Sequence, residues 1–166
     1  MLLVQNVLFN SFLLGDVKIL TVDNDCDSGD LYAVLLKNYN VTVMNAESIK
    51  EALNLLTRFV PDILICEARF LGESIDPLLQ QVRSIAQDRH QVIPIFVTST
   101  FPAINLAERL KIKVEAYQMK PVDLDQFVIQ VWKLILLSKI TQPLTVHNWL
   151  ARLGMGKTFY SCEGVL

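Results

Sequence analysis

Five short apolar runs rich in β-branched residues alternate with segments of helical period from Val17 onward, and no other feature restricts the fold as much. Such alternation is typical of βαβ units that build a parallel sheet. Because the runs are almost continuously apolar, we expect both faces of that sheet to be buried. The predicted strands span 17–22, 41–44, 62–66, 92–97 and 114–117.

The segments between the predicted strands have the period of amphipathic helices. Ile49, Ala52, Leu53 and Leu56 are spaced at i, i+3, i+4 and i+7, which places them on one stripe of a helix. Right-handed crossovers leave few arrangements of five such units, and the commonest is the flavodoxin-like order 2-1-3-4-5. We therefore expect an α/β fold with three α-β-α layers and a doubly wound, five-stranded parallel sheet. The further predicted helices lie around 31–36, 78–85, 104–110 and 127–137.

The chain of 166 residues has room for one domain, which we place at 17–140. Residues 1–16 are an apolar N-terminal extension that we expect to cover the domain as a helix or strand. This extension lacks the basic leader and cleavage site of a signal peptide and is too short to span a bilayer. Residues 141–166 are a C-terminal tail with one short predicted helix, too short for a DNA-binding or enzymatic domain.

Charge and cysteine content narrow the choice of partners and compartment. The 15 basic and 17 acidic residues are interspersed and give a net charge of −2, so we expect neither a nucleic acid nor a membrane as partner. The three cysteines Cys26, Cys66 and Cys162 are too few and too scattered for a disulfide framework. This usage fits a reducing compartment, and we expect a cytoplasmic protein.

Polar side chains follow four of the predicted strands, at the point where each strand ends. Asp23 follows the first strand, Glu67 the third, Ser99 the fourth and Lys120 the fifth. Ligands of open α/β sheets bind beyond the carboxyl ends of the strands, where the strand order reverses. Each residue alone could be a solvated cap of a strand. Together, at matching ends of four strands, they favour a functional site.

Four motifs, read in order, resemble the receiver domain of response regulators, and the resemblance covers Val17 to Ile140. Asp23, Asn24 and Asp25 resemble the acidic metal-binding turn of that family. The segment PDILICE at 61–67 resembles the strand that leads to the phosphoacceptor, with Glu67 where the family has aspartate. The segment PIFVTS at 94–99 resembles the strand that ends in the switch hydroxyl, and YQMKP at 117–121 resembles the aromatic-to-lysine-proline signature.

The resemblance implies a magnesium site, and this chain departs from it. In receivers the phosphoacceptor aspartate and two acids after the first strand hold Mg²⁺; here the implied ligands are Asp23, Glu67 and the backbone carbonyl of Arg69. Asn24 stands where the second acid is expected, so the formal charge with Lys120 is about −1 where the family has about −2. We therefore expect Mg²⁺ to bind weakly or not at all, and no other cofactor. Asp25 could compensate if its side chain turned inward.

The resemblance also assigns roles outside the metal site. Ser99 and Tyr117 hold the positions of the switch hydroxyl and switch aromatic, and Lys120 and Pro121 those of the conserved lysine and of a proline that follows a cis peptide bond. The loop at 68–72 lacks the family's methionine-proline pair. Its apolar Phe70 and Leu71 could cover the site or contact a partner.

These residues leave more than one function open. The first interpretation is a stand-alone, atypical receiver that is not an enzyme. It binds a histidine kinase or a downstream effector without phosphorylation, and Glu67 mimics phosphoaspartate. A degenerate site, in which Glu67 only pairs with Lys120, is equally open. The alternative is a genuine phosphoacceptor in a two-component phosphorelay.

A homodimer through the face formed by 104–110, 114–117 and 127–137 is a further expectation. A flavin carrier is disfavoured, because the turn at 23–27 is too acidic to bind a phosphate.

Overall fold

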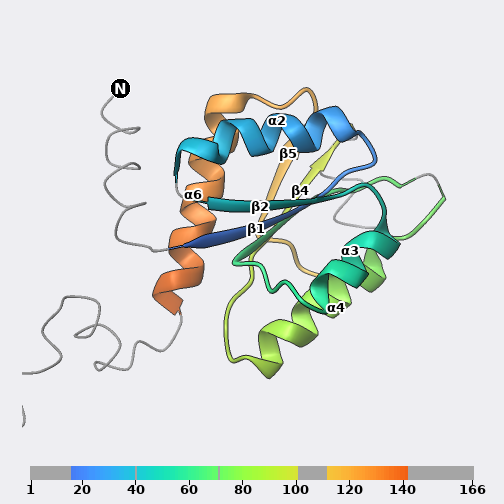
Figure 1. Ribbon diagram of the computed structural model, residues 1–166, viewed down its shortest axis with the longest axis vertical. Coiled ribbons are helices and arrows are strands. Elements are labelled where there is room, and N and C mark those ends of the chain that lie inside the picture. Colours follow the sequence, from blue (N-terminus) through green and yellow to red (C-terminus); the bar gives the residue numbers. More distant parts are fainter. Residues whose placement is uncertain (1–15, 40, 71, 101–111, 142–166) are drawn as a thin grey trace, which may run out of the picture.

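The computed structural model describes residues 16–39, 41–70, 72–100 and 112–141, and these form one parallel sheet flanked by helices (Figure 1). The five strands are ordered β2-β1-β3-β4-β5, and all neighbouring pairs are parallel. The predicted fold class and strand order are confirmed. The strands are β1 Val17–Val22, β2 Val41–Ala46, β3 Ile63–Glu67, β4 Ile95–Ser99 and β5 Ala116–Met119.

Two strands begin two or more residues later than the sequence pattern predicted. Strand β4 begins at Ile95, where the prediction began at residue 92, because Pro94 has no N–H to donate to a strand ladder. Strand β5 begins at Ala116, where the prediction began at residue 114. The Glu115 side chain accepts a hydrogen bond from the Ile95 N–H (2.7 Å), so this residue caps the neighbouring strand with its side chain.

Helices follow the strands, and side-chain caps fix the N-termini of the first two that the structure describes. Asp25 accepts a hydrogen bond from the Asp27 N–H, so the first described helix begins at Cys26 and not near residue 31 as predicted. Ser48 caps the next helix by accepting from the Glu51 N–H. The helical elements are α2 Cys26–Leu36, the 3₁₀ turn η1 Lys37–Tyr39, α3 Ile49–Leu56, α4 Asp76–Asp88 and α6 Leu124–Thr141.

Several predictions concern residues outside the described ranges. The predicted helix around 104–110, nearly all of the N-terminal extension and nearly all of the C-terminal tail lie there. Among the helices that the structure does describe, none has the length and hydrophobicity needed to cross a membrane.

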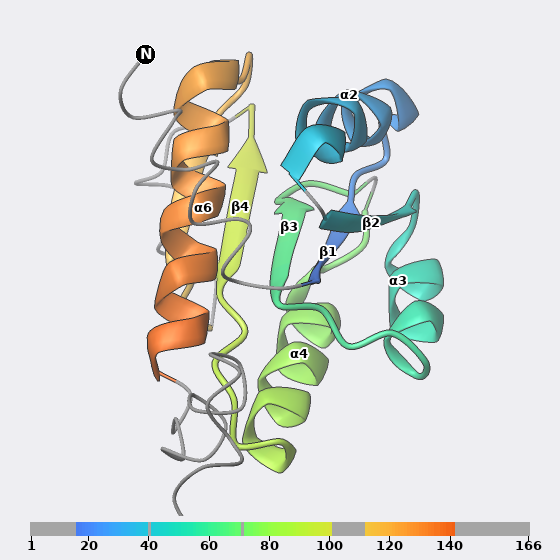
Figure 2. The same ribbon diagram turned by 60° about the vertical axis from the view of Figure 1, so that its left-hand side comes forward.

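The sheet separates two apolar clusters. Helices α2 and α6 cover one face, and α3 and α4 cover the other (Figures 1 and 2). Along β1, Val17 and Ile19 belong to the cluster beneath α2 and α6, whereas Leu20 and Val22 belong to the cluster beneath α3 and α4. Every residue of β3 and β4 is buried, which confirms that both sheet faces are covered. We refer to these as the α2/α6-side cluster and the α3/α4-side cluster.

The register aligns the carboxyl ends of the strands at one edge of the sheet. Val22 at the end of β1 pairs with Cys66 of β3, and Glu67 at the end of β3 pairs with Thr98 of β4. Ser99, the last residue of β4, pairs with Met119 at the end of β5. The polar residues that end or follow these strands therefore emerge side by side.

An arginine on α4 ties that helix to the beginnings of β4 and β5. The Arg83 guanidinium contacts both carboxylate oxygens of Glu115 at 2.9 Å and donates to the carbonyl oxygens of Ile93 (3.0 Å) and Lys113 (2.6 Å). Such a multiply bonded arginine–carboxylate pair is stronger than a single exposed ion pair. It holds two strands in place at the edge opposite the polar strand ends.

We expect Arg83→Met to lower the free energy of unfolding by about 1–3 kcal/mol, because it leaves carbonyl and carboxylate acceptors without their charged donor. Chemical denaturation monitored by circular dichroism measures this loss. The matched control is Arg89→Met, which removes an exposed arginine at the end of the same helix and should change stability by less than about 0.5 kcal/mol. Equal losses in the two variants would contradict the role given to Arg83.

Candidate functional site

The Lys120 ammonium joins two buried carboxylates at the edge where the strands end. Its Nζ lies 2.7 Å from Oδ2 of Asp23 and 2.9 Å from Oε2 of Glu67. The side chains of Asp23 and Glu67 are only 3% and 5% exposed, and that of Lys120 is 17% exposed. The structure thus brings together three of the four residues on which the predicted site depends, and the pairing of Glu67 with Lys120 is confirmed.

The remaining carboxylate oxygens accept hydrogen bonds from the backbone. Asp23 Oδ1 accepts from the Asp25 N–H (3.0 Å), and Glu67 Oε1 accepts from the Arg69 N–H (3.2 Å). All four oxygens of the two acids therefore have a donor, which offsets the cost of burying two negative charges. The backbone is fixed as well, because the N–H groups of Asp23, Ala68 and Lys120 donate to the neighbouring strands at Ala46, Thr98 and Ser99.

The charges that meet at the site shift the pKa of Lys120 and that of the neighbouring Cys66. Burial by itself lowers the pKa of the Lys120 ammonium, but the hydrogen bonds and charges of Asp23 and Glu67 outweigh it, so the pKa is raised above its ordinary value. On β3, burial raises the pKa of the Cys66 thiol, and the charges of Glu67 and Asp23 raise it further. Cys66 is therefore a core residue that stays protonated and unreactive.

Tyr32 on α2 reaches toward the same site, and the sequence analysis missed it. It is 2% exposed, and its ring stacks on Phe127 of α6 with centroids 4.4 Å apart. Burial raises the pKa of its phenol; the Lys120 charge lowers that pKa and the Asp23 charge raises it. The available sequence signal was its spacing to Leu36, which places a tyrosine on the buried face of the helix.

Asn24 and Asp25 do not extend the acidic site. Asn24 is exposed. The Asp25 carboxylate accepts from the Asp27 N–H (3.2 Å) and from the Ser28 hydroxyl (2.9 Å), so it caps α2. The Asp25 side chain therefore does not turn inward, and it does not compensate for Asn24.

The two buried acids of the site already have a partner for each of their carboxylate oxygens. Within the described ranges, no three His, Cys, Asp or Glu side chains lie close enough together to hold a metal. Asp23 and Glu67 each give one oxygen to Lys120 and the other to a backbone N–H. The Lys120 ammonium thus lies between the two carboxylates. The predicted weakness of Mg²⁺ binding, with the Arg69 carbonyl as a ligand, stays a prediction.

The residues in the switch positions lie on adjacent strands. Ser99 is buried at the end of β4, and Tyr117 of β5 is half-buried against the α3/α4-side cluster. Burial raises the pKa of the Tyr117 phenol, and the Glu67 charge raises it further. The peptide bond between Lys120 and Pro121 is cis, as the resemblance implied. The switching roles of Ser99 and Tyr117 stay predictions.

The loop after β3 differs from the lid or contact surface that its apolar residues suggested. Phe70 is 5% exposed and packs in the α3/α4-side cluster, and its backbone forms an isolated bridge with Glu73. The Phe70 ring therefore anchors the loop to the core and cannot act as an exposed docking residue. Leu71 lies outside the described ranges.

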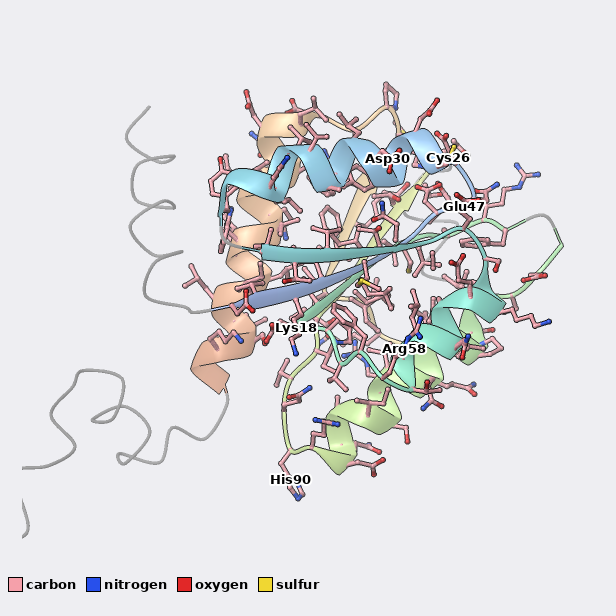
Figure 3. All side chains as sticks on the ribbon, viewed as in Figure 1. Lys18, Cys26, Asp30, Glu47, Arg58 and His90 are labelled. Atoms are coloured by element: carbon pink, nitrogen blue, oxygen red, sulfur yellow. The ribbon has the colours of Figure 1, made fainter. Side chains whose placement is uncertain are left out.

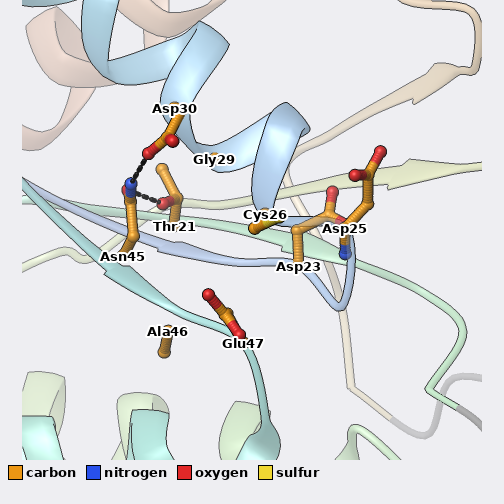
Figure 4. Close-up of a pocket in the computed structure, with 9 residues that line it drawn as sticks. All are labelled: Thr21, Asp23, Asp25, Cys26, Gly29, Asp30, Asn45, Ala46 and Glu47. Atoms are coloured by element: carbon orange, nitrogen blue, oxygen red, sulfur yellow. Dashed lines mark hydrogen bonds between the residues drawn. The ribbon is translucent and has the colours of Figure 1, made fainter.

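An acidic pocket adjoins Asp23 between the start of α2 and the end of β2 (Figure 4). Besides Asp23, its lining includes three acidic residues, Asp25, Asp30 and Glu47. Cys26, Asp30 and Glu47 lie together at this end of the domain, whereas His90 lies at the opposite end (Figure 3). The residues that line the acidic pocket are Thr21, Asp23, Asp25, Cys26, Gly29, Asp30, Asn45, Ala46 and Glu47.

We expect Lys120→Met to lower the free energy of unfolding at neutral pH by about 3–5 kcal/mol, because two buried carboxylates lose their common cation. The folded-state pKa of Lys120 is raised, so its stabilisation is fully present below the ordinary lysine pKa of about 10.4. It is lost as the pH rises through the higher folded-state pKa. Urea titrations of both proteins should therefore show the stability difference narrowing only in strong alkali.

The control for this pH dependence is Lys50→Met, which removes an exposed lysine from α3. The free energy of unfolding of this variant should change with pH in the same way as that of the wild type. A wild-type advantage over Lys120→Met that disappears already near neutral pH would mean that the ammonium does not hold the two acids.

No family model matches the chain. In sequence it is 27% identical over 113 residues to the transcriptional regulatory protein ZraR of Salmonella typhimurium, covering 68% of this chain and 25% of that protein. It is 31% identical over 104 residues to the regulatory protein VanR of Enterococcus faecium, covering 63% of this chain and 43% of VanR. The chain thus spans a quarter of ZraR and less than half of VanR.

Solved structures match over nearly their whole length. A response regulator receiver domain protein from Clostridium thermocellum superposes with a TM-score of 0.63 at 20% identity, covering 75% of this chain and 98% of that one. A two-component response regulator from Clostridium difficile gives 0.63 at 20% identity, covering 74% and 98%. The chemotaxis protein CheY4 of Vibrio cholerae gives 0.64 at 17% identity, covering 72% and 99%. The described residues therefore have the fold of a response-regulator receiver domain.

Proposed function

We propose that this chain is an atypical receiver domain of two-component signalling that acts by binding a protein partner without being phosphorylated. The observation that carries the proposal is the Lys120 ammonium bound to Asp23 and Glu67 at once. The receiver fold and the sequence similarity to ZraR and VanR support the signalling context. The partner is a histidine kinase or a downstream effector, and the domain is a cytoplasmic binding module and not an enzyme.

In this proposal Glu67 mimics a phosphorylated aspartate. Glutamate is one methylene longer than aspartate, so its carboxylate extends toward the position that a phosphoryl group on a shorter side chain would occupy. Its oxygens accept from the Lys120 ammonium at 2.9 Å and from the Arg69 N–H at 3.2 Å. An ammonium and a backbone N–H are the kinds of donor that hold an oxyanion through charge-assisted hydrogen bonds.

The composition of the site supports independence from phosphorylation. Phosphoryl transfer to a carboxylate depends mainly on positioning and on neutralising charge with a divalent cation. Here an exposed Asn24 stands in place of an acid, and Lys120 engages both buried carboxylates. Without a firmly held divalent cation, Glu67 would attack a phosphodonor as a poorly activated nucleophile next to a second negative charge.

The degenerate-site interpretation and the phosphoacceptor interpretation predict different behaviour. A degenerate site would need Glu67 only for stability, so partner binding would not depend on its charge. A phosphoacceptor would form a glutamyl phosphate, which is stable in acid and labile in base. Strand β5 and helix α6, which contribute to the proposed dimer face, also carry the exposed side chains of Met119 (52%) and Leu124 (38%) just outside the predicted ranges. These side chains can contribute to docking in any of these cases.

We expect no phosphoryl adduct when the wild-type protein is incubated with acetyl phosphate and Mg²⁺ and examined by intact-protein mass spectrometry. The matched positive control is the double variant Glu67→Asp with Asn24→Asp, which restores the acids of the family pattern and should gain an adduct. A base-labile adduct on Glu67 of the wild type would overturn the proposal in favour of the phosphorelay.

We expect Glu67→Ala and Glu67→Gln each to weaken capture of the partner by roughly tenfold or more, because a charge-assisted interaction of about 1.5–3 kcal/mol is lost. Quantitative pull-downs from a lysate of the source organism, compared with wild type, measure the ratio. The control Glu73→Gln neutralises an exposed acid and should leave capture unchanged. Undiminished capture by folded Glu67→Gln would favour the degenerate site.

A further inference from the structure

Strand β2 forms one edge of the sheet and lacks the features that usually protect an edge. Among the described strands, it pairs only with β1. Its sequence, VTVMNA, contains no charged residue and no proline, and Thr42 and Asn45 are exposed. Sheet edges of this kind offer their outer backbone N–H and C=O groups to a further strand. The edge at β2 can therefore accept a strand from another chain.

Asp30 marks the side of α2 that lies next to this edge. Its carboxylate accepts a hydrogen bond from the side-chain amide of Asn45 on β2 at 3.4 Å, and α2 lies above β2 in Figures 1 and 2. The residues at i+3, i+4 and i+7 from Asp30 share its side of the helix. These are Ala33, Val34 and Lys37, and we refer to the four residues together as the α2 stripe.

The α2 stripe is exposed, apolar at its centre and oppositely charged at its ends. Val34 is 68% exposed, the highest value among the large apolar side chains that the structure describes. Ala33 beside it is half-buried, and Asp30 and Lys37 are exposed. Along the helix the order is thus acid, apolar, apolar, base. Turned end for end, the same stripe presents a base opposite each acid, so the α2 stripe is complementary to itself.

We propose that this chain forms a symmetric homodimer in which α2 packs antiparallel to α2 of a second copy and β2 pairs antiparallel with β2 of that copy. In a two-fold interface, residue i contacts residue j and residue j contacts residue i. Asp30 of each copy then faces Lys37 of the other, and Ala33 faces Val34. This surface differs from the β5 and α6 face, and the proposal is independent of phosphate mimicry at Glu67.

One two-fold axis serves both contacts. The centre of the α2 stripe, between Ala33 and Val34, lies about 7 Å along the helix from Gly29 at about 1.5 Å per residue. Gly29 packs against Asn45, since a Cβ at Gly29 would lie 3.3 Å from that side chain. Helix α2 runs opposite to β2, and about 7 Å corresponds to about two strand residues. The axis therefore passes near Val43, in the middle of β2.

The lateral spacing of helix and strand fits as well. Paired helices lie about 8–10 Å apart and paired strands about 4.8 Å apart, so a shared axis places α2 about 2 Å inside the edge strand. Helix α2 contacts both β2 and β1, as this position requires. The second copy thus extends the sheet and covers the α2 stripe at the same time.

Exchanging the charges at the two ends of the α2 stripe tests the dimer. Sedimentation equilibrium of the full chain should show a species of about twice 18.8 kDa and gives its dissociation constant. We expect Asp30→Lys and Lys37→Asp each to raise this constant at least roughly tenfold, because like charges then face each other. The double variant Asp30→Lys with Lys37→Asp restores opposite charges and should return the constant to within about threefold of the wild type.

The apolar centre of the stripe and the strand pairing are tested together. We expect Val34→Lys to abolish the dimer, whereas the matched control Leu124→Lys, at a 38% exposed side chain on α6, should keep it. In hydrogen exchange followed by mass spectrometry, the amides of β2 should exchange at least roughly tenfold faster in Val34→Lys than in the wild-type dimer. Peptides from β3 should stay protected in both proteins, which shows that the variant folds.

Several results would overturn the proposal. One is a wild type that sediments at 18.8 kDa at its highest soluble concentration. Another is a dimer that survives Val34→Lys in the folded protein, or one that only Leu124→Lys abolishes, which would identify the β5 and α6 face. If Val34→Lys does not fold, the charge exchange decides: a double variant as weakly associated as the single ones would reject the antiparallel pairing. Equal exchange of β2 in dimer and monomer would reject it too.

Discussion

The Lys120 ammonium holds together the edge of the sheet at which two buried negative charges converge. Asp23 and Glu67 come from strands that lie side by side, and their carboxylates are almost completely removed from water. Two like charges at such a place would force one acid to take up a proton or the strand ends to separate. The lysine arrives from β5, on the far side of β4, so it is correctly placed only when the sheet has its complete order. The two ion pairs can therefore form only when β5 has joined the sheet.

The proposed function adds a second role to the contact that stabilises the fold. In stability terms, Lys120 compensates the buried acids. In signalling terms, a receiver that carries its anionic group in its own sequence has no unmodified state to return to, so its output depends on synthesis, degradation or partner concentration. The proposed mimicry needs no covalent chemistry at Glu67; it needs only that the carboxylate stays ionised and held by its two donors. Under this proposal, a partner that binds the phosphorylated form of a conventional receiver would bind this chain without phosphorylation.

The fold could be predicted because its apolar strands and amphipathic helices have clear periods, and the strand order followed from few rules. The predicted strand boundaries were less accurate where a side chain competes with the backbone for a hydrogen bond. The Glu115 carboxylate, for example, accepts the hydrogen bond of the Ile95 N–H. The pairing of Glu67 with Lys120 could be expected from the strand ends alone. The orientation of Asp25 could not, because an aspartate after a strand can point into the site or cap the next helix with equal local preference. The position of Tyr32 near the site was missed. The apolar spacing of its helix predicts only that Tyr32 is a core residue.

The burial of the ion pairs has a consequence for how salt acts on this protein. The side chains of Asp23, Glu67 and Lys120 are only 3%, 5% and 17% exposed, so the two carboxylates and their lysine are largely closed off from the solvent. Mobile ions screen charges that they can approach and affect enclosed pairs much less. Raising the ionic strength would therefore weaken contacts made by the exposed acids around Asp30 and Glu47 while leaving the Lys120 interactions nearly intact. A binding partner that is released by salt would, on this basis, be recognising the acidic rim and not the buried centre.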